Sequence, residues 1–219
     1  MKKYIEALKK CSLFSNIESE NFETVLNCLG ARVVKFDKKY TILAEGSEAK
    51  YIGIILSGSA QIFQVDYYGN RNIIGSLTVG DMFGESFAAA GIRRLPVSVV
   101  ASDDSEVMLI ECSRVLYTCE RCCGFHQALI YNLVRSFATK NLLFHQRIEI
   151  TSKRTTREKL MAYLMLIAKR TGKSSFEIPF DRQELADYLG VDRSGLSAEI
   201  SKLRKEGIIE SKKNYFRLL

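Results

Sequence analysis

Apolar residues near the start of the chain recur at the intervals of amphipathic helices. Gly30 follows the last of them, and a glycine there can adopt the left-handed conformation that ends a helix. The apolar positions are Ile5, Leu8, Leu13, Phe14, Ile17, Phe22, Val25, Leu26 and Leu29. The pattern predicts short helices between residues 4 and 29.

From residue 32 to residue 111 the pattern changes to short runs of β-branched and aromatic residues. The runs cover residues 33–34, 51–56, 61–65, 73–74, 97–101 and 107–110. Glycines lie between most of these runs, at places where turns are needed. This alternation predicts a small antiparallel barrel or roll.

Residues 126–150 contain no glycine or proline, and one set of positions recurs in alternating steps of four and three. These positions form the seam of a coiled coil and consist of Ile130, Val134, Phe137, Asn141, Phe144 and Ile148. The spacing predicts a long helix that pairs in parallel with a second copy of the chain. Asn141 takes an a position, where paired asparagines set alignment and two-strandedness. Because the seam is short, a long helix within one domain is the alternative.

Residues 181–203 have the pattern of two helices joined by a tight turn. Asp181 and Glu184 form a capping box for the first helix, and Gly190 can end it. Asp192 can cap a second helix, whose inward positions are Leu196, Ile200 and Leu203. This arrangement is typical of a helix-turn-helix.

A second helix of this kind fits the major groove of DNA with its first residues at the base edges. Arg193 is the first candidate for base recognition, since arginine can pair with O6 and N7 of guanine. Ser194 and Ser197 can read bases or phosphates, and Ala198 can offer a methyl contact to thymine. The candidates for phosphate contacts are Arg182, Gln183 and Lys202.

After Gly207, apolar and polar residues alternate on both sides of Lys212-Lys213-Asn214, which predicts a two-stranded wing with a basic tip. The last part of the chain is therefore interpreted as a winged helix. The polar residues 151–155 are expected to form a hinge before it. The predicted domains are residues 1–120 with the sensing roll, 121–150 with the dimer helix and 151–219 with the winged helix.

Charge supports a polyanionic partner for the last third of the chain. Residues 145–219 contain 16 Lys and Arg against 10 Asp and Glu, whereas residues 1–144 contain 16 against 15. The composition is 47% hydrophobic, and no run approaches the roughly 18 apolar residues that span a membrane. We therefore expect a cytoplasmic DNA-binding protein that has no membrane contact.

The chain has six cysteines, which fit reduced thiols better than a disulfide scaffold. Four of them lie close together, Cys112, Cys119, Cys122 and Cys123, so a redox role stays open. Adjacent cysteines on a helix point about 100° apart, which is poor geometry for one metal ion. His126 and His145 both fall in the long helix, so we predict no metal site, no cofactor, no catalytic residue and no enzyme activity.

The order of roll, long helix, hinge and winged helix resembles that of the CRP/FNR family of bacterial transcription regulators. The motifs that carry the resemblance are Gly80-Asp81-Met82-Phe83-Gly84-Glu85, Asp104-Ser105-Glu106-Val107 and the run from Arg182 to Arg193. The resemblance implies an α+β fold with an antiparallel β-roll of the jelly-roll type, similar to cyclic-nucleotide-binding domains. It also implies a homodimer on a two-fold-related operator, with half-sites about 10 base pairs apart, that contacts RNA polymerase.

The sequence departs from the members of this family that bind cyclic AMP. Those members hold the cyclic phosphate with an Arg-Ser/Thr-Ala run, whereas the corresponding run here is Leu95-Pro96-Val97. Proline lacks an N–H donor, and Arg94 comes one residue too early. Leu143-Phe144-His145 stands where such members place small hydroxyl residues against the purine.

We therefore expect another small-molecule effector, or a redox signal. The candidate effector-binding residues are Gly84, Glu85, Ser86, Arg94, Phe144 and His145. One alternative is a constitutive DNA-binding protein whose roll binds nothing. A thiol or iron–sulfur sensor is another alternative. Cys11 and Cys28, which lie before the roll, are 17 residues apart, unlike the short N-terminal cysteine run of oxygen-sensing members.

Overall fold

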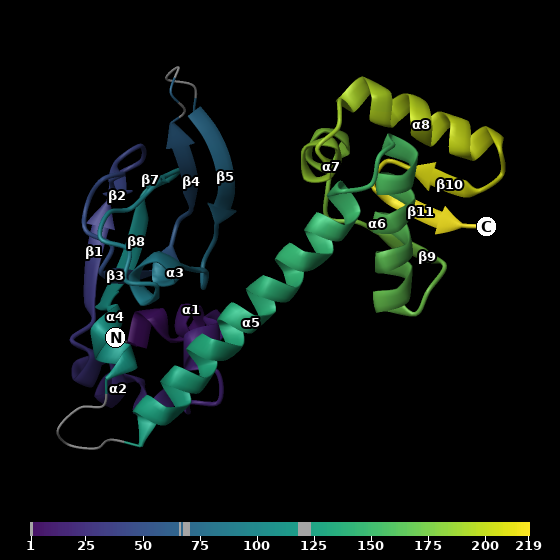
Figure 1. The fold of residues 1–219 in the computed structure, drawn as a ribbon. Helices are drawn as coiled ribbons and strands as arrows, with labels where there is room; N and C mark the ends of the chain where they lie inside the picture. The colour runs from purple at the N-terminus through teal and green to yellow at the C-terminus, as the bar shows by residue number, and fades with distance from the viewer. Residues whose placement is uncertain (1, 66, 68–70, 118–123) are drawn as a thin grey trace. The chain divides into compact units, whose positions relative to one another are not determined.

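The computed structural model describes residues 2–65, 67, 71–117 and 124–219 (Figure 1). The chain forms two compact units, Met1–Thr139 and Lys140–Leu219, which are described separately below. The first contains short helices and an antiparallel β-roll, and the second contains a winged helix. The predicted α+β fold is confirmed.

The first unit begins with short helices, as predicted. They are η1 (Lys2–Tyr4), α1 (Ile5–Lys10), η2 (Ser12–Phe14), η3 (Ser19–Asn21) and α2 (Phe22–Leu29). Gly30 ends α2 with a left-handed conformation, as its position in the sequence predicts.

The roll consists of two four-stranded antiparallel sheets. One sheet has the order β1 (Arg32–Phe36), β8 (Ser105–Glu111), β3 (Tyr51–Ser57) and β6 (Met82–Phe83). The other has the order β2 (Thr41–Leu43), β7 (Ser98–Ala101), β4 (Ala60–Val65) and β5 (Arg71–Leu77). The sequence pattern did not indicate β2, β6 or the short helices α3 (Glu85–Ala89) and α4 (Cys112–Leu116), because two to five residues carry too little periodicity.

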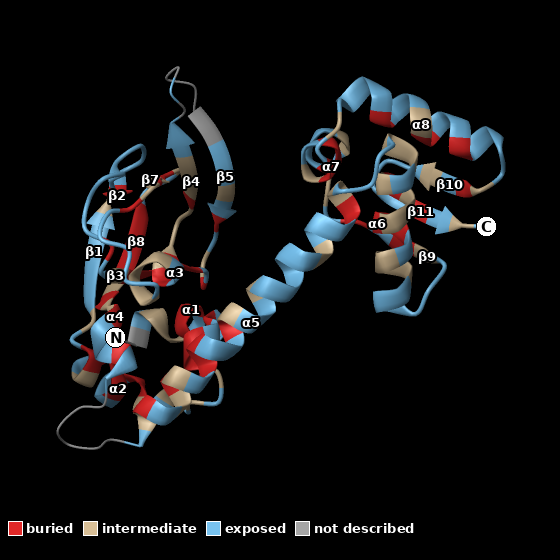
Figure 2. Cartoon of the chain, in the orientation of Figure 1, coloured by how far each residue is buried: buried red, intermediate tan, exposed pale blue. Residues whose placement is uncertain are grey.

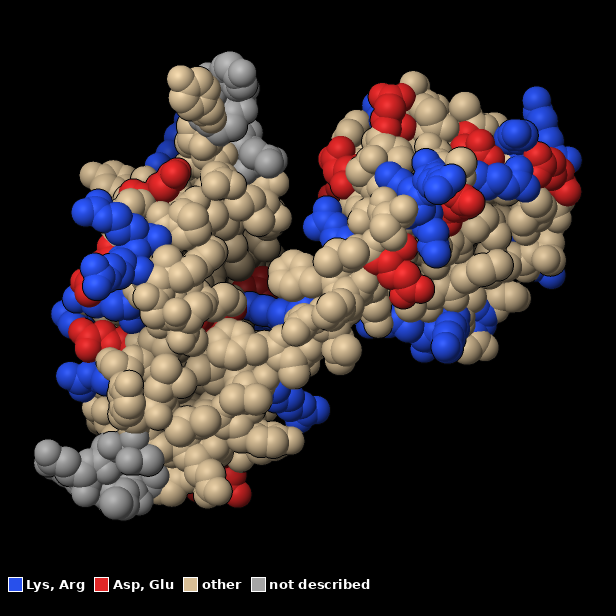
Figure 3. Space-filling model, viewed as in Figure 1, with Lys and Arg blue, Asp and Glu red and all other residues tan. Residues whose placement is uncertain are grey.

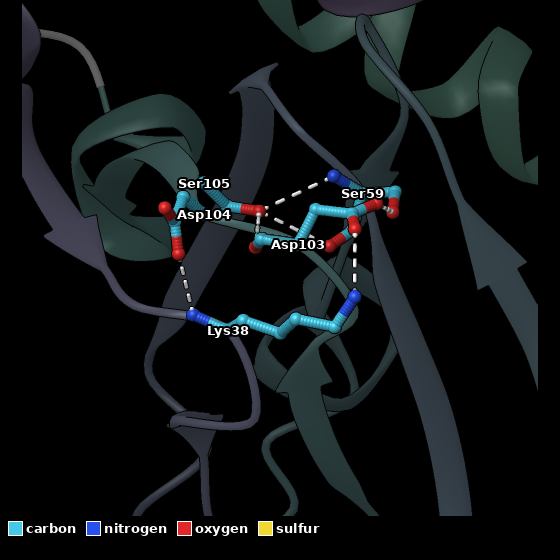
Figure 4. A network of polar contacts seen from close by, with 5 residues as sticks. All are labelled: Lys38, Ser59, Asp103, Asp104 and Ser105. Atoms are coloured by element: carbon cyan, nitrogen blue, oxygen red, sulfur yellow. Dashed lines mark hydrogen bonds and ion pairs between the residues drawn. The ribbon is translucent and has the colours of Figure 1, made fainter.

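Three turns meet at one end of the roll through polar side chains (Figure 4). The Lys38 backbone N–H donates to Asp104, and the Ser59 hydroxyl donates to Asp103 at 2.7 Å. The Ser105 hydroxyl donates to the backbone oxygen of Asp103, and it accepts the N–H of Ser59. Gly58 has a φ of +79°, and a Cβ atom there would lie 2.3 Å from Oγ of Ser105, so the turn requires glycine. These contacts fix the ends of both sheets to each other.

Helix α5 (Phe125–Thr151) is the predicted long helix, and its residues belong to both units. Leu129 and Leu133 are buried in the core of the first unit together with α1 and α2. The Asn132 amide donates to the backbone oxygens of Leu13 and Ser15, at 3.0 and 2.7 Å. The first half of α5 is therefore an integral part of the first unit.

The predicted dimer seam runs along α5 and lies mostly on its surface. Val134, Phe144 and Ile148 are 59%, 62% and 61% exposed. Asn141 is also exposed, whereas Ile130 and Phe137 are half-buried. Leu142 and Leu143 are exposed as well.

The second unit is a winged helix that includes the end of α5. It contains α6 (Thr156–Thr171), β9 (Ser175–Glu177), α7 (Arg182–Leu189), α8 (Arg193–Lys205), β10 (Ile209–Lys212) and β11 (Tyr215–Leu218). The predicted two-stranded wing is present as the hairpin of β10 and β11, and β9 adds a third strand in the order β10-β11-β9, which the sequence analysis did not predict. The short β9 precedes α7 and pairs with β11 only after the chain has folded back, so its neighbours in sequence do not reveal it.

The core of the second unit lies between α6, α7, α8 and the wing (Figure 2). Ile150, in the last turn of α5, is 3% exposed and belongs to this core. The guanidinium of Arg147 lies over the ring of Tyr188 at 5.2 Å, and Tyr188 packs against Tyr163 and Phe180. Burial raises the pKa of Tyr163 to about 12. The end of α5 is thus anchored in the winged helix.

Candidate nucleic-acid interface and effector region

The helix-turn-helix is built from two capped helices, as the sequence predicts. The Asp181 side chain accepts the N–H of Glu184 at 2.8 Å, and Glu184 accepts the N–H of Asp181 at 2.7 Å. Gly190, at a φ of +62°, ends α7. Asp192 accepts the N–H of Gly195 at 2.9 Å and starts α8.

The inward positions of α8 are those predicted, and they orient the helix. Leu196, Ile200 and Leu203 are buried, and the opposite face of α8 is exposed (Figure 2). That face carries Arg193, Ser194, Ser197, Ala198 and Lys202. The fold therefore presents every residue of α8 that the sequence analysis assigned to DNA.

Two of the candidate side chains are engaged within the protein. The Ser194 hydroxyl donates to the carboxylate of Asp192, so Ser194 contributes to the cap of α8. These bonds hold the pKa of Asp192 below its usual range. The Gln183 amide donates to Oδ1 of Asp187 at 2.9 Å, which fixes it along the exposed side of α7.

Arg182 is half-buried against the wing. Its guanidinium lies 4.9 Å from the ring centre of Phe216 in β11. Burial lowers the pKa of Arg182, and the nearby positive charge of Arg204 acts in the same direction. The half-buried guanidinium of Arg182 and the exposed one of Arg204 together favour an anion beside them.

Two grooves border these residues. A groove of about 760 Å³ lies between the start of α7, Arg193 and the wing tip, and its basic lining residues are Arg182, Arg193 and Lys213. A second groove, of about 480 Å³, lies between α8 and the wing. Its lining includes Arg182, Arg204, Lys212 and Lys213. Cationic side chains thus converge from α7, α8 and the wing.

Sequence reasoning placed the basic wing tip but did not include Arg204, Lys212 or Lys213 among the site residues. Arg204 directly follows the buried Leu203. The helical spacing in the sequence could have placed it on the same side of α8 as Arg193 and Ser197. Arg204 lies eleven residues after Arg193, about three turns, and therefore on the same side of α8. That Arg204 also lies near the wing can be seen only in the folded structure.

The candidate effector residues of the roll lie at the start of α3. Gly84 has a φ of +78°, and a Cβ atom there would lie 2.7 Å from the backbone oxygen of Tyr51. Glu85 is 2% exposed and accepts the Ser86 hydroxyl at 3.2 Å. The short helix therefore carries a buried acidic side chain, whose charge acts on Cys112 of α4.

The other candidate effector residues lie apart from this turn in the sequence. Arg94 is exposed, and its guanidinium is 3.5 Å from the backbone oxygen of Gly46. Leu95 and Val97, which follow it, are buried. Phe144 and His145 lie in the second unit, and both are exposed.

The structure describes three of the six cysteines. Cys11 and Cys112 are buried, and Cys28 is half-buried. Burial raises the pKa of Cys112, and the charge of Glu85 adds to the effect, so its reactive thiolate form is disfavoured. Cys119, Cys122 and Cys123 lie outside the described residues. Within the described ranges, no group of three or more His, Cys, Asp or Glu side chains is arranged to hold a metal ion.

No helix in the described part of the chain has the length and apolar character needed to span a membrane.

Comparison with known proteins gives the same two-part division. Residues 33–122 match the cyclic nucleotide-binding domain family, and residues 158–219 match the Crp-like helix-turn-helix domain family. Together the two matches cover more than half of the chain.

Similar curated proteins are transcription activators. A probable transcriptional activator of Rhizobium leguminosarum bv. viciae is 27% identical over 191 residues, which is 80% of this chain and 72% of the relative. The transcriptional activator protein FnrL of Cereibacter sphaeroides is 23% identical over 195 residues, 80% of this chain and 73% of the relative.

Solved structures share the fold. The catabolite activator protein of Thermus thermophilus superposes with a TM-score of 0.51 at 19% identity, over 95% of this chain and 93% of that one. The c-di-GMP responsive global regulator CLP of Xanthomonas campestris has a TM-score of 0.61 at 15% identity, over 92% and 99%. With both domain families present in the expected order, the chain belongs to the CRP/FNR family of DNA-binding transcription regulators.

Proposed function

We propose that the chain works as a homodimer that reads a two-fold-related operator with one α8 helix from each copy. The observation that carries the proposal is the exposed face of α8, which lies beside the basic side chains of α7 and the wing. A symmetric dimer requires half-sites about 10 base pairs apart. The two copies would then place their α8 helices in successive major grooves on one side of the duplex.

Arg193 reads a base in this proposal, because it lies in the first turn of an exposed helix and has an extended, bidentate donor group. Ser197 lies one turn further on the same side and is the second candidate for a base contact. Ala198 offers its methyl group, and Ser194 mainly caps the helix. Phosphate contacts come from the flanking side chains, namely Arg182, Gln183, Lys202, Arg204, Lys212 and Lys213.

The dimer forms through α5. Val134, Phe144 and Ile148 would remain largely in water in a single chain, and pairing of two helices removes this apolar surface from water. Asn141 lies in the same seam and would pair with its copy. Ile130 and Phe137 complete the seam from the half-buried side of the helix.

The roll senses a signal other than cyclic AMP. The buried Leu95 and Val97 occupy the run where the cyclic phosphate would need donors, and this supports a different ligand. Gly84, Glu85, Ser86, Arg94, Phe144 and His145 remain the candidate contacts. An effector shifts the population of dimers only as far as it binds the DNA-competent state more tightly.

Function then follows the predicted three-part division, with residues 1–120 sensing, 121–150 pairing and 151–219 reading DNA. We further propose that the dimer contacts RNA polymerase, as the family resemblance implies, and that it has no catalytic activity. The protein would work in the cytoplasm, where the bacterial chromosome lies.

Selection of binding sites from random duplexes, followed by sedimentation of the complexes, tests the dimer and the operator together. We expect two-fold-related sites and two chains per duplex. Asn141→Lys, which places two like charges in the seam, should give monomers at micromolar concentration and abolish binding to full sites. Asymmetric single sites, or an unchanged dimer in the variant, would contradict the proposed seam.

A thermal-shift screen of metabolites tests the sensor, since a ligand that prefers the native state stabilises it by RT ln(1 + [L]/Kd). A stabilising compound that also changes operator affinity would identify the effector. A protein that binds its operator equally well under every condition would instead favour the constitutive alternative.

A further inference from the structure

One arginine of α6 contacts two carboxylates, that of Glu199 in α8 and that of Glu206, the C-cap residue of α8. Nη2 of Arg157 lies 2.6 Å from Oε2 of Glu206, and Nη1 lies 3.6 Å from Oε1 of Glu199. The side chains of Arg157, Glu199 and Glu206 are 36%, 20% and 35% exposed, so solvent only partly screens the contact. Both carboxylates lie on the side of α8 away from Arg193 and Ser197.

The two carboxylates lie on one edge of α8. They are seven residues apart, which is about two turns, and therefore lie above one another on the helix. At about 100° per residue, this edge lies on one side of the buried stripe formed by Leu196, Ile200 and Leu203. Arg193 and Ser197 lie on the opposite side of the same stripe.

Apolar packing alone sets the depth of α8 better than its rotation. Three buried side chains in one stripe attract the rest of the core without strong directionality, so they permit small rotations about the helix axis. Recognition groups need to be held to within about 10–20° of their working orientation. A planar guanidinium that donates a hydrogen bond to Glu206 and forms an ion pair with Glu199 supplies the missing directional restraint.

We propose that Arg157 is a positioning residue for DNA recognition, which fixes the rotation of α8 by holding Glu199 and Glu206, so that Arg193 and Ser197 meet the base edges correctly. This inference rests on the proposed role of α8. It gives Arg157 an effect on sequence discrimination although it lies on another helix and touches no DNA.

The place of Arg157 in the chain adds to this role. It lies in the first turn of α6, whose start is fixed by a capping box between Thr155 and Glu158. Residues 152–155 separate this turn from α5. A displacement of the start of α6 is therefore passed directly to α8 through the guanidinium.

The test compares full-length dimers on the selected operator and on unrelated duplex of the same length. Arg157→Met keeps the apolar stem of the side chain and removes both contacts. Arg217→Met is the matched control, since Arg217 lies in the same unit and pairs with Glu210 of the wing at 3.7 Å. Both variants lose one ion-paired arginine, so the change in net charge is the same in the two.

We expect Arg157→Met to lower the ratio of operator to unrelated-DNA affinity about tenfold, while the control stays within about twofold of wild type. Glu206→Gln keeps the shape of the side chain, removes one ion pair and should give an intermediate loss. It also serves as the second variant if Arg157→Met does not fold. Arg157→Lys should restore only part of the ratio, because one ammonium group cannot hold two carboxylates as a guanidinium does.

A purely structural ion pair would lower the unfolding temperature and the affinity for all DNA together, with the ratio unchanged. That result in both Arg157→Met and Glu206→Gln, or an equal fall in the control, would overturn the inference. If wild-type protein shows discrimination and Arg193→Ala reduces it, the proposed function stands independently of that outcome. A wild-type protein that prefers no sequence would overturn the proposed function, and this inference with it.

Discussion

The roll and the winged helix use their positive charges differently. In the roll, Nζ of Lys3 lies 2.7 Å from a carboxylate oxygen of Glu106, and Lys35 lies 3.7 Å from the other oxygen. Lys38 pairs with Asp103 in the turn network (Figure 4). Blue and red side chains accordingly lie next to one another along the edge of the roll near β1 (Figure 3).

In the winged helix, two arginines have carboxylate partners, Arg157 with Glu206 and Arg217 with Glu210. Among the described residues, Arg193, Arg204 and the lysines of the wing tip form no ion pair. Paired cations hold a fold together, whereas unpaired cations at a groove are free to replace the counterions of a phosphate backbone.

The largest expected effect comes from removing the unpaired set. Neutralising Arg204, Lys212 and Lys213 together to Gln should lower affinity for every duplex by roughly 100- to 1,000-fold at 0.1 M salt. The slope of log affinity against log salt should decrease by about 2.7, since each lost phosphate contact contributes about 0.9. Fluorescence anisotropy across a salt series measures both.

Removal of positive charge from the roll sharpens the comparison between the two units. A Lys35→Gln, Lys38→Gln double variant also loses positive charge, but on side chains that already have partners. Its salt slope should equal that of wild type. A slope that falls as much per charge as in the wing variant would mean that the roll also contacts DNA, and the contrast would then be lost.

A smaller and more selective effect is expected at Arg193. Arg193→Ala should reduce operator affinity by about 1 to 3 kcal/mol and hardly change binding to unrelated DNA. Lys202→Gln should reduce both equally, because a phosphate contact carries no sequence information. An equal loss on both duplexes in Arg193→Ala would assign Arg193 to the backbone.

The smallest effect is expected at the paired carboxylate of the roll. The hydrogen bond from Lys3 holds the pKa of Glu106 below its usual range, so the ionised form stabilises the fold above the ordinary glutamate pKa. That stabilisation is lost as the pH falls through the lowered pKa. Glu106→Gln should therefore lower the unfolding temperature near pH 7. The difference in unfolding temperature between wild type and variant should become smaller in acid. A constant difference from pH 7 to pH 3 would contradict this assignment.

The contrast between the two units also explains what the sequence could predict. The helix-turn-helix is specified by neighbours in sequence, such as Asp181 with Glu184 and Asp192 with Gly195, so its caps and inward face were predicted correctly. The roll and the long helix were predicted from periodicity alone. The short strands β2, β6 and β9 depend on partners far along the chain, and the sequence analysis missed them.

The same argument applies to the functional residues. Arg157 and Glu206 are 49 residues apart, and nothing local indicates that they meet. The wing brings Lys212 and Lys213 to Arg204 only after β10 and β11 have paired. The effector residues come from three separate segments of the chain, and their chemistry depends on a ligand, so no local pattern specifies them.

Ile150 and Arg147 are anchored in the winged helix, and this limits how the winged helix could be exchanged between proteins. Because the last turns of α5 belong to the winged-helix core, a chimaera joined at residue 151 would leave that core without Ile150 and Tyr188 without its cation. A chimaera joined near Lys140 carries both, and the graft then lies inside a continuous helix. In the proposed dimer the heptad phase must match across such a joint, so the winged helix can be combined with a new first unit only in steps of seven residues.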